Sequence, residues 1–279
     1  MSKIIAISNQ KGGVGKTTTA VNLAASLSVL EKKTLLVDLD SQGNATTGMG
    51  IDKRDIEYSV FDFILKGEEG GNETPESVSF DKIIRKPGYS SANDFIHVMP
   101  SNQDLVSLEY ELYKMIAREY RLRDALQEVR DRYDYIIIDC PPSLSILTLN
   151  AMAAADSVLI PIQCEFYALE GLAELLNTIR TVQKTLNKNL QIEGALLTMY
   201  DSRLNLSKQV SREVKEYFKE KTFQTVVFRN VKLSEAPSSG KPILEYDIVS
   251  TGSENYFQLA EEIIKADGKE KPTSASPRP

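Results

Sequence analysis

The chain of 279 residues has no tryptophan, one histidine and two cysteines. It also lacks any run of about 18 apolar residues, so no transmembrane helix is predicted. Cys140 and Cys164 are too few for a disulfide framework, and we expect two buried thiols. A shared metal or iron–sulfur site is the alternative. The single histidine, His97, lies in a strand-like run and is expected to be structural.

Targeting signals are missing as well. The chain passes from Met1 directly into an apolar strand at Ile4, which is not typical of a signal peptide. We therefore expect the protein to stay in the cytoplasm.

Positive charge is scarce, with 33 Lys and Arg against 39 Asp and Glu and a net charge of −6. Taken over the whole chain, this balance argues against a nucleic-acid-binding protein. One segment differs, because nine basic residues stand against four acidic ones, a net charge of +5. Its basic residues are Arg203, Lys208, Arg212, Lys215, Lys219, Lys221, Arg229, Lys232 and Lys241. The segment is either a surface for a polyanion or a solvated helix face of mixed charge, and the sequence favours neither.

Apolar runs alternate with helical patterns along the chain. The predicted strands are Ile4–Ser8, Thr34–Asp38, Tyr135–Asp139, Ser157–Ile162 and Gln191–Thr198. The predicted helices are Lys16–Leu30, Gln103–Ala117, Arg121–Arg132, Leu144–Ala154 and Leu169–Leu186. Apolar strands separated by helices indicate an α/β fold, a mostly parallel twisted sheet with helices on both faces. Ligands of such sheets bind at the carboxyl ends of the strands.

A single domain, residues 1–266, accounts for this alternation. Residues 66–94 break it with six Gly and Pro and no clear period, so we expect a surface excursion there. Residues 267–279 have almost nothing to bury and are expected to be disordered.

The run Lys11-Gly12-Gly13-Val14-Gly15-Lys16-Thr17-Thr18 is typical of a phosphate-binding loop. Its glycines allow backbone N–H groups to surround phosphate oxygens, and the helix that follows favours anions at its N-terminus. Lys16 can reach the β- and γ-phosphates, and the Thr17 hydroxyl can ligate Mg²⁺. The sequence therefore predicts a site for ATP and Mg²⁺.

The loop departs from the common pattern at its start. Gln10 stands where the first glycine belongs, and Lys11 adds a second lysine. Lys11 is badly placed for the nucleotide of its own chain, so it either reaches the nucleotide of a second subunit or is simply exposed to solvent.

Acidic residues follow two of the predicted strands. Asp139 ends an apolar strand in the manner of a Walker B aspartate, which binds Mg²⁺ directly or through water. Asp38 and Asp40 end another strand on the same side of it, and either could orient or deprotonate the attacking water. A turn capped by aspartates is the structural alternative.

These motifs together resemble the ParA/MinD family of ATPases with a deviant Walker A loop. Lys11–Thr18 is similar to that loop, Leu35–Thr46 to the second motif of the family, and Ile136–Ser143 to its Walker B motif. Arg229–Pro242 is similar to a stretch typical of the ParA/Soj partition branch. The resemblance covers nearly the whole chain and implies the P-loop NTPase fold.

The resemblance implies a Mg²⁺-dependent ATPase that dimerises face to face around two ATP molecules. Lys11 would cross to the phosphates of the partner, and Lys16 would hold those of its own chain. Asp40 would serve hydrolysis, with Asp38 in support. The implied metal ligands are Thr17, Asp40 and Asp139.

The resemblance also implies partners. The ATP-bound dimer of this branch binds double-stranded DNA nonspecifically, and a ParB-like centromere-binding protein stimulates hydrolysis and releases it. By resemblance, Arg203, Arg229 and Lys232 occupy positions used for DNA. We expect association with the nucleoid and none with membranes.

Several positions depart from the family pattern. Phe228 replaces a proline near the adenine, where Asn230 remains as a candidate contact. Ser41 replaces the proline of the second motif. Residues 248–251 are not basic as they often are in relatives, which weakens part of the expected DNA surface.

Three other functions stay open. A MinD-like division-site protein would need a basic amphipathic C-terminal helix for a membrane, whereas this C-terminal region is acidic. An iron–sulfur reductase would need cysteines at a different spacing. A nucleotide-dependent scaffold would result if Asp40 were not competent for hydrolysis.

Overall fold

The computed structural model describes residues 2–65, 78–89, 94–165 and 171–269. Within them, seven strands form one sheet in the order β3-β2-β4-β1-β5-β6-β7, and every neighbouring pair is parallel. The strands are β1 (Lys3–Ile7), β2 (Thr34–Asp38), β3 (Ile96–Met99), β4 (Tyr135–Asp139), β5 (Ser157–Gln163), β6 (Gln191–Tyr200) and β7 (Thr222–Phe228). The predicted α/β fold is confirmed. Two strands are added to the five predicted ones, β7 and β3, and β3 is the strand-like run that contains His97.

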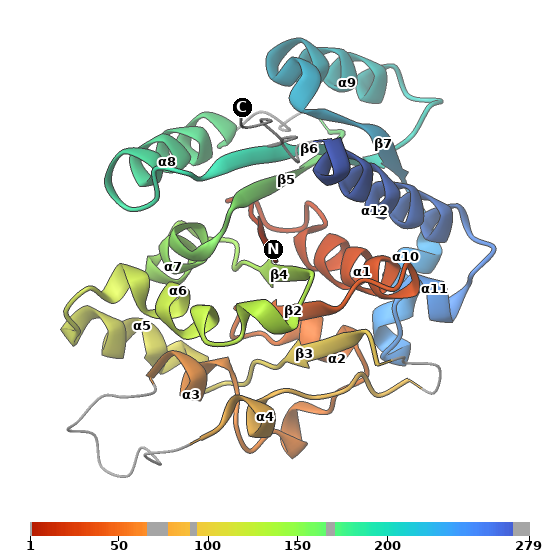
Figure 1. The fold of residues 1–279 in the computed structure, drawn as a ribbon. Coiled ribbons are helices and arrows are strands. Elements are labelled where there is room, and N and C mark those ends of the chain that lie inside the picture. The colour runs from red at the N-terminus through yellow and green to blue at the C-terminus, as the bar shows by residue number, and fades with distance from the viewer. Residues whose placement is uncertain (1, 66–77, 90–93, 166–170, 270–279) are drawn as a thin grey trace, which may run out of the picture.

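Helices lie on both faces of the sheet (Figure 1). They are α1 (Lys16–Val29), α2 (Asn44–Gly48), α3 (Val60–Leu65), α4 (Phe80–Ile83), α5 (Leu105–Lys114), α6 (Arg121–Gln127), α7 (Ile146–Ala154), α8 (Leu172–Thr185), α9 (Asn205–Phe218), α10 (Val231–Glu235), α11 (Ile243–Tyr246) and α12 (Thr251–Lys269). No helix in the described ranges combines the length and the apolar character needed to cross a membrane.

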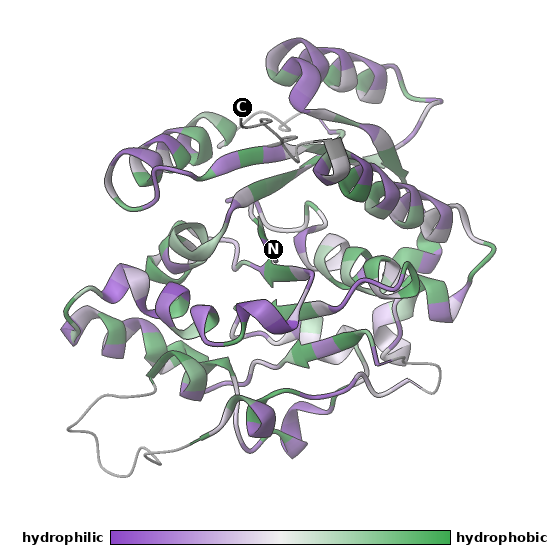
Figure 2. Cartoon of the chain, in the orientation of Figure 1, coloured by the Kyte–Doolittle hydropathy of each residue, from purple (hydrophilic) through white to green (hydrophobic). Residues whose placement is uncertain are grey.

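The strand β1 shows how one strand serves two cores. Ile4 and Ala6 join the core on the side of α5 to α9, and Ile5 and Ile7 join the core beneath α1 and α12. All four side chains are buried, because successive residues of a strand point to opposite faces. In Figure 2 the central strands carry mostly hydrophobic colouring, whereas the outer turns of α9 are hydrophilic. A sheet buried on both faces explains the unbroken apolar runs in the sequence.

The C-terminal helix α12 is not among the predicted elements. Its Tyr256, Leu259 and Ile263 are fully or almost fully buried, and the helix packs against α1 and β7. Asp267, expected in a disordered tail, lies in this helix and accepts a hydrogen bond of 2.7 Å from a tyrosine hydroxyl on β4. The tail therefore starts later than predicted, and residues 270–279 lie outside the described ranges.

The predicted surface excursion, residues 66–94, is partly a core segment. Phe80 and Ile83 on α4 are buried in the core on the α5 side. Arg85 then pairs with β3 in an isolated antiparallel bridge, which covers that edge of the sheet. A few apolar residues among glycines and charges gave no periodic signal, so the prediction was wrong for 78–89. Residues 66–77 and 90–93 of the excursion lie outside the described ranges.

One predicted helix is shorter than expected. Over Arg121–Arg132, α6 ends at Gln127 and a 3₁₀ turn covers Arg130–Arg132. Val129, between the helix and the turn, is still buried in the core, so the apolar spacing that suggested a longer helix is met without one.

Candidate nucleotide-binding site

The loop between β1 and α1 runs over the carboxyl edge of the sheet. Gly13 and Gly15 have φ angles of 74° and 90°, in the left-handed region that favours glycine. A Cβ added to Gly12 or Gly13 would meet no described atom within 4 Å, so this side of the loop is open. Thr17 and Thr18 lie in the first turn of α1, beside the free N–H groups that favour an anion.

Two side chains outside the motif hold this loop in shape. The Asn9 amide donates to the carbonyl of Pro161 on β5 (2.7 Å), and its oxygen accepts from the Lys11 N–H (3.0 Å). The Thr198 hydroxyl on β6 donates to the carbonyl of Val14 (2.8 Å). Sequence reasoning missed Thr198, because it ends an ordinary predicted strand and only the pairing of distant strands brings it to the loop.

The two lysines of the loop differ in their surroundings. The Lys16 side chain is buried, and its ammonium donates to the carbonyl of Lys11 (3.0 Å). Burial lowers the pKa of Lys16, and the neighbouring carboxylate of Asp139 opposes this only in part. Lys11 is half-exposed, and among the described residues its ammonium has no ion-pair partner. It is therefore free to reach outside its own chain.

Asp139 is a fully buried carboxylate whose two oxygens have no hydrogen-bond partner among the described residues. Burial raises the pKa of Asp139 well above its usual range, and the charge of Asp38 raises it further. Parallel pairing places Asp38 directly opposite it on β2. The residue two positions later is Pro141, which has no N–H to donate, so the chain leaves this carboxylate unsatisfied.

The unpartnered carboxylate fits a divalent cation. The Thr17 hydroxyl is near enough to act on Asp139 as a donor, which opposes the rise of its pKa, but it does not make a well-formed hydrogen bond to either oxygen. The described residues contain no cluster of three or more His, Cys, Asp or Glu that could hold a metal without other ligands. Mg²⁺ commonly binds through one or two carboxylates together with substrate phosphates and water, and this donor set fits that pattern.

Asp38 is also fully buried, but its oxygens are occupied. One accepts from the N–H and the hydroxyl of Thr46, both at 2.7 Å, and the other accepts from the Asp40 N–H at 3.2 Å. Burial raises its pKa to about 6, which these hydrogen bonds oppose. The resemblance implies a supporting role for Asp38 beside metal and water, and in the structure Asp38 anchors the turn that carries Asp40.

Asp40 lies at the surface of the site. Its side chain is half-buried, and one of its oxygens accepts from the N–H of Gln42 (2.9 Å). The other oxygen is available to a water or a metal ion. Asp40 also acts electrostatically on both Lys16 and Asp139, so the three charged groups share one site.

The residues expected near adenine lie where β6 and β7 end. Phe228 is half-exposed and packs edge to face on Tyr200, with ring centroids 5.7 Å apart. The Asn230 oxygen accepts from the Lys232 N–H (2.8 Å) and caps α10. Its amide nitrogen remains available, so Asn230 can still contact a base while it holds the helix.

The three expected DNA residues are exposed and already paired with carboxylates. Arg203 pairs with Asp201, Arg229 with Glu165 and Lys232 with Glu235, at 2.7 to 3.0 Å. Arg203 and Arg229 belong to one surface, because the Arg229 N–H donates to the carbonyl of the β6 residue Tyr200. The middle of the basic segment is a helix face of mixed charge on α9, as the alternative interpretation expected.

The cysteines and the histidine agree with structural roles. Cys140 and Cys164 are buried, and burial raises the pKa of Cys164 to about 12 and that of Cys140 further. Such thiols are poor metal ligands and nucleophiles. His97 lies beside the Tyr133 hydroxyl at 3.0 Å, and burial lowers its pKa.

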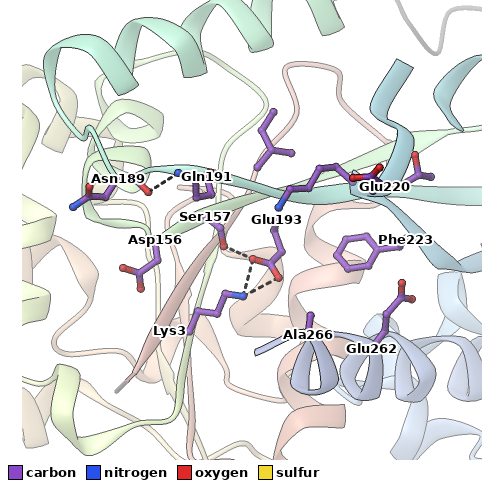
Figure 3. A pocket seen from close by; sticks show the side chains of 13 residues that line it. Lys3, Asp156, Ser157, Asn189, Gln191, Glu193, Glu220, Phe223, Glu262 and Ala266 are labelled. Atoms are coloured by element: carbon purple, nitrogen blue, oxygen red, sulfur yellow. Dashed lines mark hydrogen bonds and ion pairs between the residues drawn. The ribbon is translucent and has the colours of Figure 1, made fainter. Parts of the chain in front are cut away.

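A cavity of about 590 Å³ opens at the opposite, amino edge of the sheet (Figure 3). Lys3 on β1 lies between Glu193 and Asp267, at 2.9 and 2.5 Å. Glu193 also accepts from the Ser157 hydroxyl (2.6 Å). Because these charged groups satisfy one another, they tie β1, β5, β6 and α12 together and leave little for a ligand.

Known proteins resemble this chain over nearly its whole length. The family model described as an AAA domain matches residues 2–192. The sporulation initiation inhibitor protein Soj of Bacillus subtilis is 54% identical over 263 residues, covering 94% of this chain and 98% of that protein. Chromosome partitioning protein ParA of Myxococcus xanthus is 52% identical and covers 98% of this chain and 91% of its own. The structure of cobyrinic acid a,c-diamide synthase from Mycobacterium smegmatis with ADP and magnesium has a TM-score of 0.80 at 32% identity, covering 99% of this chain and 100% of its own.

Proposed function

We propose a DNA-partition cycle driven by ATP, from the premise that this chain belongs to the ParA/Soj family of chromosome-partitioning ATPases. One observation carries the proposal: the unpartnered, buried carboxylate of Asp139 beside an open phosphate loop. A protein keeps such a group only where a ligand repays the cost of burying it. Mg²⁺ has the charge that suits the Asp139 carboxylate, and the phosphates of ATP have the charge that suits the N–H groups of the loop.

Each residue of the loop has a defined task in this cycle. The N–H groups from Gly12 to Thr18 surround the phosphates, and Lys16 neutralises them at their inner side. Thr17, Asp139 and Asp40 would hold Mg²⁺. Bound Mg²⁺ would supply positive charge that offsets the negative charge developing on the phosphates. Asp40, with one free oxygen, orients the attacking water.

Lys11 makes the site depend on two subunits. Its ammonium lacks an ion-pair partner among the described residues, and the next two residues, Gly12 and Gly13, have open space beside them. In a dimer formed face to face, it reaches the phosphates of the other chain as an arginine finger does in trans. ATP then lies between two subunits and joins them.

The dimer presents two copies of the surface that contains Arg203, Arg229 and Lys232. Their carboxylate partners keep the affinity of this surface for DNA low in a single subunit, because the phosphates of DNA must compete with those carboxylates. Two copies double the number of phosphate contacts, so nonspecific binding becomes strong only with ATP. A ParB-like partner that stimulates hydrolysis would release the dimer from DNA.

DNA binding tests this cycle. We expect the chain to bind double-stranded DNA of unrelated sequences with ATP and to bind it far more weakly with ADP or without nucleotide. Raising the salt from 50 to 200 mM should weaken the complex by at least about tenfold, since phosphate contacts release counterions. The double variant Arg203→Ala, Arg229→Ala should lose binding, whereas Arg180→Ala on α8 should not. Equal binding in all nucleotide states would contradict the proposal.

A membrane-bound division-site protein is the second candidate, and α12 argues against it. The apolar face of that helix is buried against α1 and β7, so it is not available to lipid. Co-sedimentation with anionic liposomes would reveal membrane binding, and we expect none with ATP or ADP.

A further inference from the structure

Thr46 on α2 joins three segments of the chain. Its side chain is fully buried. Its N–H and its hydroxyl both donate to the same carboxylate oxygen of Asp38, at 2.7 Å each. The hydroxyl oxygen accepts from the N–H of Ser101, just after β3, at 2.9 Å. The hydroxyl thus donates to the end of β2 and accepts from the end of β3.

The turn that carries Asp40 is built on this link. The other oxygen of Asp38 accepts from the Asp40 N–H, and the carbonyl of Asp40 accepts from the Gly43 N–H at 2.8 Å. A Cβ added to Gly43 would lie only 3.2 Å from the carbonyl of Ser101 and 2.7 Å from the Lys53 side chain. The turn therefore lies closely packed between β2, the segment after β3 and Lys53.

We propose that Thr46 is a positioning residue for hydrolysis and fixes the turn so that Asp40 meets the attacking water. This inference rests on the proposed function for the role of Asp40. Without the hydroxyl, Asp38 loses one of its three donors, and the Ser101 N–H loses its acceptor. Both groups are buried and would seek other partners, which shifts the turn. A small displacement of a group that orients water slows the chemical step more than it weakens binding.

Thr47 supplies a matched control. It neighbours Thr46 in sequence and on the same helix, but it is exposed, and its hydroxyl donates to the carbonyl of Gly43 at 3.1 Å within that helix. The two threonines look alike in the sequence, and only the tertiary contacts separate them.

Steady-state ATP hydrolysis by the full chain, with Mg²⁺ and nonspecific DNA, tests the proposal. We expect Thr46→Val to lower kcat by about 10- to 100-fold with little change in KM. Binding of a fluorescent ATP analogue should change by less than about threefold, because the phosphate loop is intact. Thr46→Ser keeps the hydroxyl and should restore most of kcat, and Thr47→Val should resemble the wild type. A Thr46→Val variant with the wild-type kcat, or a serine variant as slow as the valine variant, would overturn the proposal.

Amide hydrogen exchange gives a second measurement that does not need turnover. Thr46→Val should raise the exchange of the segment 39–47, while the phosphate loop and α12 stay as protected as in the wild type. Unchanged exchange there would overturn the positioning role even if the variant were slow. A wild-type chain without ATP turnover would instead defeat the proposed function, and the exchange result would still decide the role of Thr46.

Discussion

The two edges of the sheet use buried charge in opposite ways. At the amino edge, Lys3 lies between Glu193 and Asp267, and each charge has a partner. At the carboxyl edge, Asp139 is buried without one, and Lys16 has only a backbone carbonyl. The first arrangement stabilises the fold by itself, whereas the second is costly until a ligand arrives. A cavity of about 590 Å³ thus lies at the edge where the charges are satisfied, and the candidate functional site lies at the edge where they are not.

The pKa values of the two lysines express the same difference. Burial acts to lower the pKa of both. At Lys3 the charges of Glu193 and Asp267 outweigh burial, and the pKa is raised. At Lys16 burial prevails over Asp139, and the pKa is lowered. The charged form of a buried lysine such as Lys16 is therefore stabilised most when a phosphate lies beside it.

Removing the unpartnered carboxylate should have the largest effect. Asp139→Asn should lower ATP hydrolysis by at least about 100-fold, because Mg²⁺ loses a charged ligand. The same variant without ligands should be more stable at pH 7 by about 1–3 kcal/mol, since a buried charge without a partner is gone. Hydrolysis assays and urea unfolding of the apo protein measure both effects. A variant less stable than the wild type would show that this edge, like the other, is satisfied by itself.

The pH dependence of that difference has a definite sign. The pKa of Asp139 is raised in the folded state, so the folded chain holds this proton more firmly than the unfolded chain. Its burial therefore costs stability only above the ordinary pKa of about 3.9, and the cost grows with pH up to the raised pKa. The gain in the free energy of unfolding from Asp139→Asn should vanish near pH 3.5 and increase towards neutrality. Unfolding at several pH values measures it.

Lys11 tests whether the carboxyl edge is completed by a second chain. Lys11→Ala should leave the melting temperature and the binding of one ATP per chain unchanged, because its ammonium has no ion-pair partner among the described residues. ATP-dependent dimers should be lost, which light scattering coupled to size exclusion would detect. Lys33→Ala, an exposed lysine away from the loop, is the control. Normal dimers of Lys11→Ala would remove the role across the interface.

Lys3 tests the satisfied edge. Lys3→Met should destabilise the fold by about 1–2 kcal/mol, between the values for exposed and buried ion pairs, and leave kcat unchanged. The folded pKa of Lys3 is raised, so its contribution is complete below the ordinary pKa of about 10.4. It should disappear as the pH rises through the folded value. Urea unfolding at pH 8 and pH 11 checks this, and an equal loss at both would contradict the ion-pair explanation.

Arg203 should show the smallest effect on stability. Its pair with Asp201 is exposed to solvent, and we expect no measurable change in melting temperature from Arg203→Ala. Its effect should appear only in DNA binding, where the slope of the affinity against salt concentration should fall by the amount expected for about one phosphate contact. A clear fall in melting temperature would instead assign Arg203 to the fold.

Much of the fold and of the site could be predicted from local patterns. Apolar runs and helical periods identified five strands and the α/β class, and the glycines and lysines identified the loop. The segment 78–89 and the helix α12 were missed, because their burial depends on contacts with distant residues. The lack of partners at Asp139 had a local signal, since Pro141 has no N–H to offer it.

The sequence by itself determined the phosphate loop and the two aspartates that end neighbouring strands. Their chemistry follows from residue type and spacing along the chain. Only the tertiary structure decided that Asp38 is satisfied and Asp139 is not. Asp38 receives its donors from Thr46 across a turn, and Ser101 secures that threonine from another strand. Contacts of this kind join residues far apart in the chain, and the packing of parallel strands brings them together.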